Sequence, residues 1–191
     1  MKPRQRTCKI KAEGCQGKFK PFSTLQACCM NPKCVLENKD RQAEKRHRRE
    51  KEKFREANKP RKQWEQEAQT AFNRWVRLRD AGKPCISCGN SPNDKDLLTG
   101  SRWDAGHYRS VGACPALRFH PLNCHAQCVR CNRDLSGNTV EYRLRLIKRI
   151  GEESLAWIEG PHDPNKYTID ELKEIKSMYA GLAREIERKA A

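Results

Sequence analysis

Two Cys-x-x-Cys pairs, Cys85 with Cys88 and Cys128 with Cys131, constrain the fold of this chain more than any other feature. Four thiolates presented on two tight turns match the tetrahedral ligand set of a structural zinc ion. The stretch between the pairs is too long for a minimal zinc finger. We therefore predict a zinc module at residues 85–138, in which the metal holds a long insertion in place.

The zinc module also contains polar side chains suited to hydrolysis of a phosphodiester, namely Asp104, His107, Asn123, His125 and Asn132. Such cleavage needs a base for the attacking water, and histidine suits that role near neutral pH. It also needs positive charge on the phosphate, which Mg²⁺ or Mn²⁺ held by carboxylate and amide oxygens would supply. Because Asn132 directly follows Cys131, the zinc module should fix its position.

A second group of cysteines near the N-terminus predicts a second zinc ion. Cys8 and Cys15 would form one pair, and Cys34 would pair with either Cys28 or Cys29. We favour Cys29, because the shorter loop to Cys34 makes a tighter turn. The alternative is a set of small buried thiols without a metal.

The charge of the chain favours a polyanionic partner. Forty Lys and Arg against twenty-four Asp and Glu give a net charge of +16, so nucleic acid is the expected partner. No stretch approaches the ~18 apolar residues of a membrane span, and no apolar signal segment follows the basic start of the chain. We expect a cytoplasmic protein whose clustered thiols bind metal, with Cys114 and Cys124 as buried free thiols.

The fold class that we expect is mainly α with small zinc-bound β elements. Residues 1–34 would form an N-terminal zinc knuckle, residues 35–60 a basic helical spacer, and residues 61–191 a domain containing the zinc module. The spacer has scarcely an apolar residue. It is expected to be a solvated charged helix, an arm along phosphates, or both at once.

Apolar residues at helical spacing predict the helices that brace the zinc module. A helix after Pro60 would bury one face and pack on the module, a second would follow the module, a short one would span Ser154–Glu159, and a last one would start at a capping box, Thr168-x-x-Glu171. The expected buried positions are Trp64, Ala68, Ala71, Phe72, Trp75 and Leu78; Val140, Leu144, Ile147 and Ile150; and Leu172, Ile175, Tyr179, Leu182 and Ile186. His47 and His162 are expected to be exposed or structural.

At these residues the chain resembles an HNH nuclease of the treble-clef, ββα-metal kind, in the variant whose last His is replaced by Asn. The matching parts are the two Cys-x-x-Cys pairs, the segment from Asp104 to His107, Asn123 and Asn132. The whole chain is similar to the phage NinG (Rap) recombination protein family. The motifs that carry this similarity are Pro-Cys-Ile-Ser-Cys-Gly at 84–89, Trp-Asp-Ala-Gly-His-Tyr-Arg at 103–109, Leu-Arg-Phe at 117–119 and Ser-Gly-Asn at 136–138.

The resemblance implies a structure-specific endonuclease acting on branched DNA, such as D-loops and Holliday junctions, in the host cytoplasm. It assigns His107 as general base and Asn123 as the residue that orients it, and it gives the catalytic Mg²⁺ or Mn²⁺ to Asp104 and Asn132. In many HNH enzymes the metal-binding acid immediately precedes the His, whereas here Gly106 does. His120 or His125 is therefore an alternative ligand.

Several basic residues are expected to contact DNA: Arg109, Arg118, Arg130 and Arg133 in the zinc module, and Lys45, Arg48 and Arg49 in the spacer. A homodimer and other recombination proteins are further expected partners. The competing interpretation is a non-catalytic, zinc-stabilised protein that binds DNA junctions. It explains the charge and the cysteines equally well, but it gives no role to His107, Asn123 and Asn132.

Overall fold

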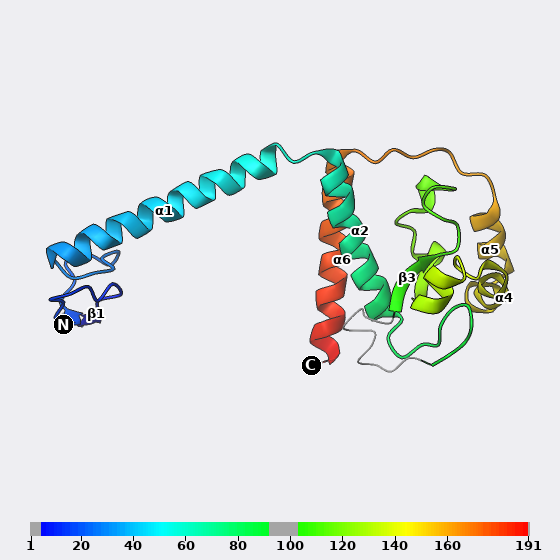
Figure 1. The fold of residues 1–191 in the computed structure, drawn as a ribbon, viewed down its shortest axis with the longest axis horizontal. Helices are drawn as coiled ribbons and strands as arrows, with labels where there is room; N and C mark the ends of the chain where they lie inside the picture. The colour runs from blue at the N-terminus through cyan, green and yellow to red at the C-terminus, as the bar shows by residue number, and fades with distance from the viewer. Residues whose placement is uncertain (1–4, 92–102, 191) are drawn as a thin grey trace. The chain divides into compact units, whose positions relative to one another are not determined.

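The computed structural model describes residues 5–91 and 103–190. Residues 92–102, which belong to the predicted zinc module, lie outside the described residues, as do 1–4 and 191. The chain divides into two compact units, Met1–Lys59 and Pro60–Ala191. The expectation of a mainly helical fold with small strand pairs is confirmed (Figure 1).

The N-terminal unit is a cysteine-rich knuckle that leads directly into a helix. Strand β1 (Arg6–Thr7) pairs antiparallel with β2 (Lys18–Phe19), and α1 spans Pro32–Ala57. The Asn31 side chain caps α1 by accepting hydrogen bonds from the backbone N–H groups of Lys33 and Cys34. Cys34, in the first turn, is the buried residue of this helix. The predicted solvated, charged helix is thus present, and it begins inside the knuckle.

Two long helices of the second unit pack side by side and run in the same direction (Figure 1). Helix α2 spans Arg61–Arg79 and α6 spans Ile169–Ala190. Ion pairs join them near the middle and near the end, from Lys176 to Glu67 at 2.8 Å and from Arg74 to Glu187 at 2.5 Å. The predicted capping box of α6 is confirmed, because the Thr168 N–H donates to Glu171 and the Glu171 N–H donates back to the Thr168 hydroxyl.

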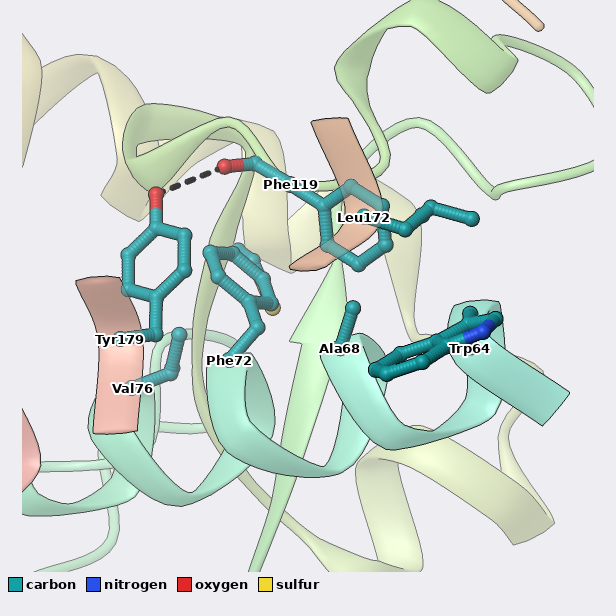
Figure 2. Close-up of a cluster of buried hydrophobic side chains, with 8 residues drawn as sticks. Trp64, Ala68, Phe72, Val76, Phe119, Leu172 and Tyr179 are labelled. Atoms are coloured by element: carbon teal, nitrogen blue, oxygen red, sulfur yellow. Dashed lines mark hydrogen bonds between the residues drawn. The ribbon is translucent and has the colours of Figure 1, made fainter. Parts of the chain in front are cut away.

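The main core lies between these helices and the loop that contains Phe119 (Figure 2). The Phe72 ring packs edge-on against Phe119 and Tyr179, with centroids 5.9 and 4.8 Å away. The Tyr179 hydroxyl donates a 2.9 Å hydrogen bond to the Phe119 carbonyl. The predicted buried face of α2 is confirmed at Trp64, Ala68, Phe72 and Leu78, and Val76 joins it.

A β-hairpin carries the residues of the candidate site. Strand β3 (Trp103–His107) pairs antiparallel with β4 (Cys124–Cys128), with Trp103 opposite Cys128 and His107 opposite Cys124. Short 3-10 turns, η1 (Pro115–Leu117) and η2 (Pro121–Asn123), lie in the connection between the strands, and a π-helical turn, η3 (Arg130–Asp134), follows β4. Helix α2 contacts both strands, as we predicted for its apolar face.

Helices α4 (Thr139–Ile150) and α5 (Glu152–Glu159) follow η3, and the predicted buried face of α4 is wrong in part. Val140 and Leu144 are 73% and 51% exposed, whereas Tyr142 and Leu146 are buried. Helix α4 is turned so that the Tyr142 hydroxyl reaches the backbone of β3, where it donates to the Gly106 carbonyl. This hydrogen bond gives the buried Tyr142 hydroxyl a partner. Tyr142, which is absent from the predicted apolar stripe, therefore lies at the centre of the buried face of α4.

The apolar face of α6 also differs from the prediction near its C-terminal end. Leu172 and Tyr179 are buried and Ile175 is partly buried, as expected. Leu182 is 37% exposed, however, and its neighbour Ala183 is buried instead. A small residue at that position lets α6 lie close to α2.

Candidate metal and nucleic-acid site

Four cysteines of the zinc module converge as the sequence predicts. The Sγ atoms of Cys85, Cys88, Cys128 and Cys131 all lie within 4.8 Å of one another, and those of Cys88 and Cys128 are 3.8 Å apart. A zinc ion with four Zn–S bonds of about 2.3 Å has S–S edges of about 3.8 Å. The Cys128 N–H donates to the Cys85 sulfur, which stabilises a thiolate. These cysteines could therefore hold a zinc ion.

The N-terminal cysteines form a second tetrad, composed of Cys8, Cys15, Cys29 and Cys34, whose Sγ atoms also lie within 4.8 Å. The Sγ atoms of Cys15 and Cys29 are 3.7 Å apart, which again matches the edge of a zinc tetrahedron. Cys29, rather than Cys28, belongs to the tetrad, as the shorter loop predicted.

The pKa of the Cys8 thiol is lowered in this knuckle. Burial alone would raise that pKa, but hydrogen bonds from the backbone N–H groups of Lys11, Cys29 and Ile10 lower it to about 6. A thiol that ionises near neutral pH is suited to bind a metal.

The four cysteines of the zinc module pack directly against the hairpin. Trp103 and Ala126 pack against Cys85 and Cys131, and the Ile86 N–H donates to the Ala126 carbonyl. The four cysteines and the strands are therefore positioned as one body. Any side chain fixed by β3 or by η3 is in turn fixed relative to the four cysteines.

Asp104 and Asn132, which the HNH resemblance assigned to one metal site, lie in contact. The Asn132 Nδ2 donates to Oδ2 of Asp104 at 2.9 Å. Arg133 also binds this carboxylate, with Nε and Nη2 each 2.8 Å from one of its oxygens. Burial opposes the ionised carboxylate, but the hydrogen bonds from Arg133 and Asn132 lower the Asp104 pKa below its usual value.

His107 is held by the backbone of the loop that precedes β4. Its Nε2 lies 2.8 Å from the Arg118 carbonyl oxygen, which can only accept, so Nε2 carries the proton. The lone pair is therefore on Nδ1, which lies 3.8 Å from the Cys124 sulfur. Burial lowers the His107 pKa below 6.5, so the ring is neutral at pH 7.

His107 and the Asp104 pair are separated by the geometry of the strand. They lie three residues apart on β3, so alternation directs their side chains to opposite faces of the hairpin. The His107 ring lies 6.0 Å from the Phe72 ring of α2. In the described part of the chain no hydrogen bond joins His107 to Asp104 or Asn132.

Asn123, predicted to orient His107, is buried and holds the intervening loop instead of the His107 ring. Its Nδ2 donates to the carbonyls of Arg109 and Leu117, and its Oδ1 accepts from the Arg109 N–H. The carbonyl that binds His107 belongs to Arg118, directly after Leu117. Asn123 therefore reaches His107 only through the backbone of this loop.

The two alternative histidines lie in other surroundings. His125 is buried, with Nδ1 3.3 Å from the Tyr142 hydroxyl, and burial together with the charge of Arg79 lowers its pKa to about 3. The His120 ring lies 4.8 Å from that of Trp157. In residues 5–91 and 103–190 only the two cysteine tetrads bring three or more Cys, His, Asp or Glu ligand atoms together.

Two of the arginines predicted to contact DNA are partly buried and bind other residues of the protein. The Arg109 Nη1 donates to the carbonyls of Ile158 and Gly160, at the C-terminal end of α5. The Arg118 side chain binds Gln69 and Glu65 of α2. Both guanidinium groups therefore stabilise the frame around the site.

The other predicted DNA contacts lie on exposed surface. Arg130 is exposed in η3, and the side chain of Arg133 is 63% exposed although it is paired with Asp104. The three predicted contacts on α1, Lys45, Arg48 and Arg49, are also exposed. Their exposure lets them reach phosphates, but Arg133 would first have to leave Asp104, and Arg48 is paired with Glu52 at 3.8 Å.

Sequence reasoning missed two buried polar residues that position the site. Asp80, at the end of α2, accepts from Arg79, Lys83 and the Ala126 N–H, and hence anchors the helix to β4. Gln127, opposite Asp104 in the hairpin, donates to the Gly137 carbonyl and the Ser87 hydroxyl. The sequence does hold one sign of the role of Gln127, which is the glycine at position 106. A side chain there would collide with Gln127.

The fold and the site define a strongly basic protein with two cysteine tetrads that could hold zinc. The tetrad of Cys85, Cys88, Cys128 and Cys131 packs against a β-hairpin. Comparison with known proteins gives the family. The family model described as "Bacteriophage Lambda NinG protein" matches residues 1–189. The chain belongs to the NinG family.

Several phage proteins named "Protein ninG" are similar over nearly their whole length. The protein from Escherichia phage lambda is 42% identical, over 93% of this chain and 91% of the phage lambda protein. Those of Escherichia phage 933W and Salmonella phage P22 are 42% and 41% identical, each over 93% of this chain and 92% of their own length. No solved structure matches the chain significantly.

A membrane-spanning helix must be both long and apolar. Among residues 5–91 and 103–190, no helix is both long enough and apolar enough to cross a bilayer.

Proposed function

We propose that this protein is a metal-dependent endonuclease of the HNH, treble-clef kind, which hydrolyses phosphodiester bonds in branched DNA such as D-loops and Holliday junctions during phage recombination. The observation that carries the proposal is the contact between Asp104 and Asn132 beside the tetrad of Cys85, Cys88, Cys128 and Cys131. Two residues far apart in sequence supply a carboxylate and an amide at one place on a rigid frame. The host cytoplasm would be its place of action.

The oxygen atoms of this pair suit a hard divalent ion. Asn132 uses Nδ2 to reach Asp104, and its Oδ1 accepts no hydrogen bond within the described residues. Asp104 and the Oδ1 of Asn132 would hold Mg²⁺ or Mn²⁺, with water and phosphate completing the shell. When bound, the ion would supply positive charge to the scissile phosphate.

His107 has the properties of a general base. Its tautomer is set by the Arg118 carbonyl, its Nδ1 carries the lone pair, and burial keeps the ring neutral at pH 7. For His107 to act on the same phosphodiester as the ion, the DNA must reach both faces of β3 at its edge. Asn123 would act as a positioning residue, because it holds the loop that carries Arg118.

Charge supports DNA as the substrate. The net charge is +16, and exposed basic residues lie on both the zinc module and α1, among them Arg130, Arg133, Lys45, Arg48 and Arg49. Contacts of this kind release counterions from DNA, so affinity should fall steeply as salt increases.

A non-catalytic junction-binding protein is the second candidate, and one observation favours it. Arg133 binds both oxygens of Asp104, which leaves the carboxylate neutralised without a metal ion. If that ion pair persists on DNA, the zinc-stabilised frame would bind junctions without cleaving them.

Cleavage of labelled Holliday junctions, D-loops and linear duplexes in Mg²⁺ or Mn²⁺ separates the two candidates. The nuclease proposal predicts that the wild type cleaves the branched substrates and that His107→Ala binds them with unchanged affinity but cleaves at least ~100-fold more slowly. The matched control is His47→Ala, since His47 is an exposed histidine on α1, and its cleavage rate should be unchanged. Binding of intact junctions by the wild type without cleavage would instead establish the second candidate.

A further inference from the structure

We infer that the loop Pro21–Gln26 of the N-terminal unit is a stacking site for unpaired bases of DNA, with Phe22 and Leu25 as its contact residues. The inference rests on the DNA binding in the proposed function, but it does not require cleavage. It assigns the recognition of unpaired nucleotides, which branched DNA exposes and a linear duplex does not, to a segment outside the zinc module.

Phe22 and Leu25 are the most exposed large apolar side chains among the described residues, at 80% and 91%. The knuckle does not need them for its core, since Ile10, Ala12 and Phe19 already pack against the buried cysteines. Single exposed apolar residues are common, but two on one short loop form a patch that favours a partner.

Hydrogen bonds hold the backbone of this loop in one conformation. The Phe22 N–H donates to Oε1 of Gln26 at 3.0 Å, and the Gln26 Nε2 donates to the Cys28 carbonyl at 2.9 Å. Arg6 of β1 donates to the Thr24 carbonyl at 2.7 Å. The loop is therefore attached both to the strand pair and to the cysteine cluster, which reduces the entropy lost when a ligand binds.

The charge around the loop is almost entirely positive. Residues 5–34 contain one acidic residue, Glu13, and it is paired with Lys33 at 2.5 Å. The remaining cations are Arg6, Lys9, Lys11, Lys18 and Lys20. A hollow of about 550 Å³ beside Leu25 is lined in part by Arg6, Thr7 and Lys9.

The two exposed apolar side chains, Phe22 and Leu25, together with the cations around them complement single-stranded DNA. A single strand offers phosphates to the lysines and unstacked base faces to an aromatic ring. A duplex offers the phosphates but keeps its base faces stacked, so Phe22 would have no role on it. Because stacking depends little on base identity, this loop would accept any of the four bases.

Fluorescence anisotropy with the full-length, zinc-loaded protein tests the inference. Two probes of equal length are used, a linear duplex and a duplex interrupted by a gap of unpaired thymines, without added Mg²⁺. Phe22→Ala is expected to weaken binding to the gapped probe about tenfold, and Leu25→Ala about threefold, with the duplex affinity unchanged. The matched control is Phe54→Ala, because Phe54 is 70% exposed on α1, and it should leave both affinities unchanged.

Salt dependence distinguishes base stacking from phosphate contact. Phe22→Ala should leave the slope of log affinity against log salt unchanged, whereas Lys18→Ala and Lys20→Ala should each reduce it by about one. Circular dichroism and zinc content, expected to equal those of the wild type, exclude unfolding of the knuckle.

Equal loss on both probes, or no loss with Phe22→Ala, would overturn the inference while leaving the proposed function intact. If the wild type binds neither probe, both the inference and the proposed function are overturned. Binding to phosphatidylglycerol vesicles that requires Phe22, with gapped-DNA affinity unchanged in Phe22→Ala, would identify the loop as a lipid-binding site and also overturn it.

Discussion

The Asn132 side chain donates a 2.9 Å hydrogen bond to the carboxylate of Asp104, across 28 positions of sequence. Asn132 is adjacent to Cys131 and Asp104 is adjacent to Trp103, which packs on the cysteine cluster. The pair is therefore positioned from both sides by the same four-thiolate frame. Arg133, which binds the same carboxylate, is the group with which a divalent ion must compete.

Removing the Arg133 cation should strengthen metal binding. In Arg133→Gln the Asp104 carboxylate loses its paired charge, so the apparent affinity for Mn²⁺ without DNA should rise roughly two- to fivefold. Mn²⁺ binding measured by electron paramagnetic resonance checks this on the zinc-loaded protein. Arg130→Gln serves as the control, since Arg130 is exposed and forms no ion pair among the described residues.

In the same measurement, Asp104→Asn should abolish the Mn²⁺ site, because an amide replaces the only carboxylate of the pair. An unchanged Mn²⁺ affinity in both Arg133→Gln and Asp104→Asn would show that the ion binds elsewhere.

The N-terminal tetrad predicts a difference between two adjacent cysteines. Cys29→Ser should lower the zinc content from two ions per chain to one, whereas Cys28→Ser should retain two, because Cys28 is buried beside the tetrad without belonging to it. Elemental analysis of the purified variants gives the ratio directly. A loss of zinc in Cys28→Ser with full occupancy in Cys29→Ser would reverse the ligand assignment.

The cysteine ligands were predictable because their chemistry is encoded by spacing alone. Four thiols on two tight turns have few other uses, and the choice of Cys29 followed from loop length. The buried face of α4 was not predictable in the same way. It depends on the reach of the Tyr142 hydroxyl to Gly106 of β3, a tertiary contact that a hydrophobic pattern does not contain.

The candidate site was predictable as a set of residues but not as an arrangement. The HNH resemblance placed Asp104 with Asn132, and they are in contact. It also placed Asn123 against His107, whereas Asn123 holds the loop carbonyls and the Arg118 carbonyl holds His107. Strand register and loop path, which decide these partners, are set by packing between elements distant in sequence.

If His107 is the general base, the pH dependence of cleavage follows from its lowered pKa. A base acts in its unprotonated form, so the rate should rise with pH through a pKa below 6.5 and become constant at higher pH. The sign follows from burial, which disfavours the protonated ring. Single-turnover cleavage of a junction between pH 5 and 9 provides the profile, and a rate that keeps rising between pH 7 and 9 would argue against His107 as the base.

Gly106 should be intolerant of any side chain because Gln127 occupies the space beside it. An added Cβ would lie 2.0 Å from Oε1 of Gln127, so Gly106→Ala should lower the free energy of unfolding by about 1–3 kcal/mol. Gly112→Ala is the matched control, since its Cβ meets no atom within 4 Å. Thermal unfolding of the zinc-loaded variants measures both changes.

The same collision predicts a favourable coupling between Gly106→Ala and Gln127→Ala. Gln127→Ala alone loses the hydrogen bonds to Ser87 and to the Gly137 carbonyl, and it should destabilise the hairpin. The double variant should be more stable than the sum of the two single losses, because the smaller residue at 127 makes room for the methyl group at 106. Strictly additive losses would mean that the backbone of β3, and not the side chain of Gln127, excludes a larger residue beside His107.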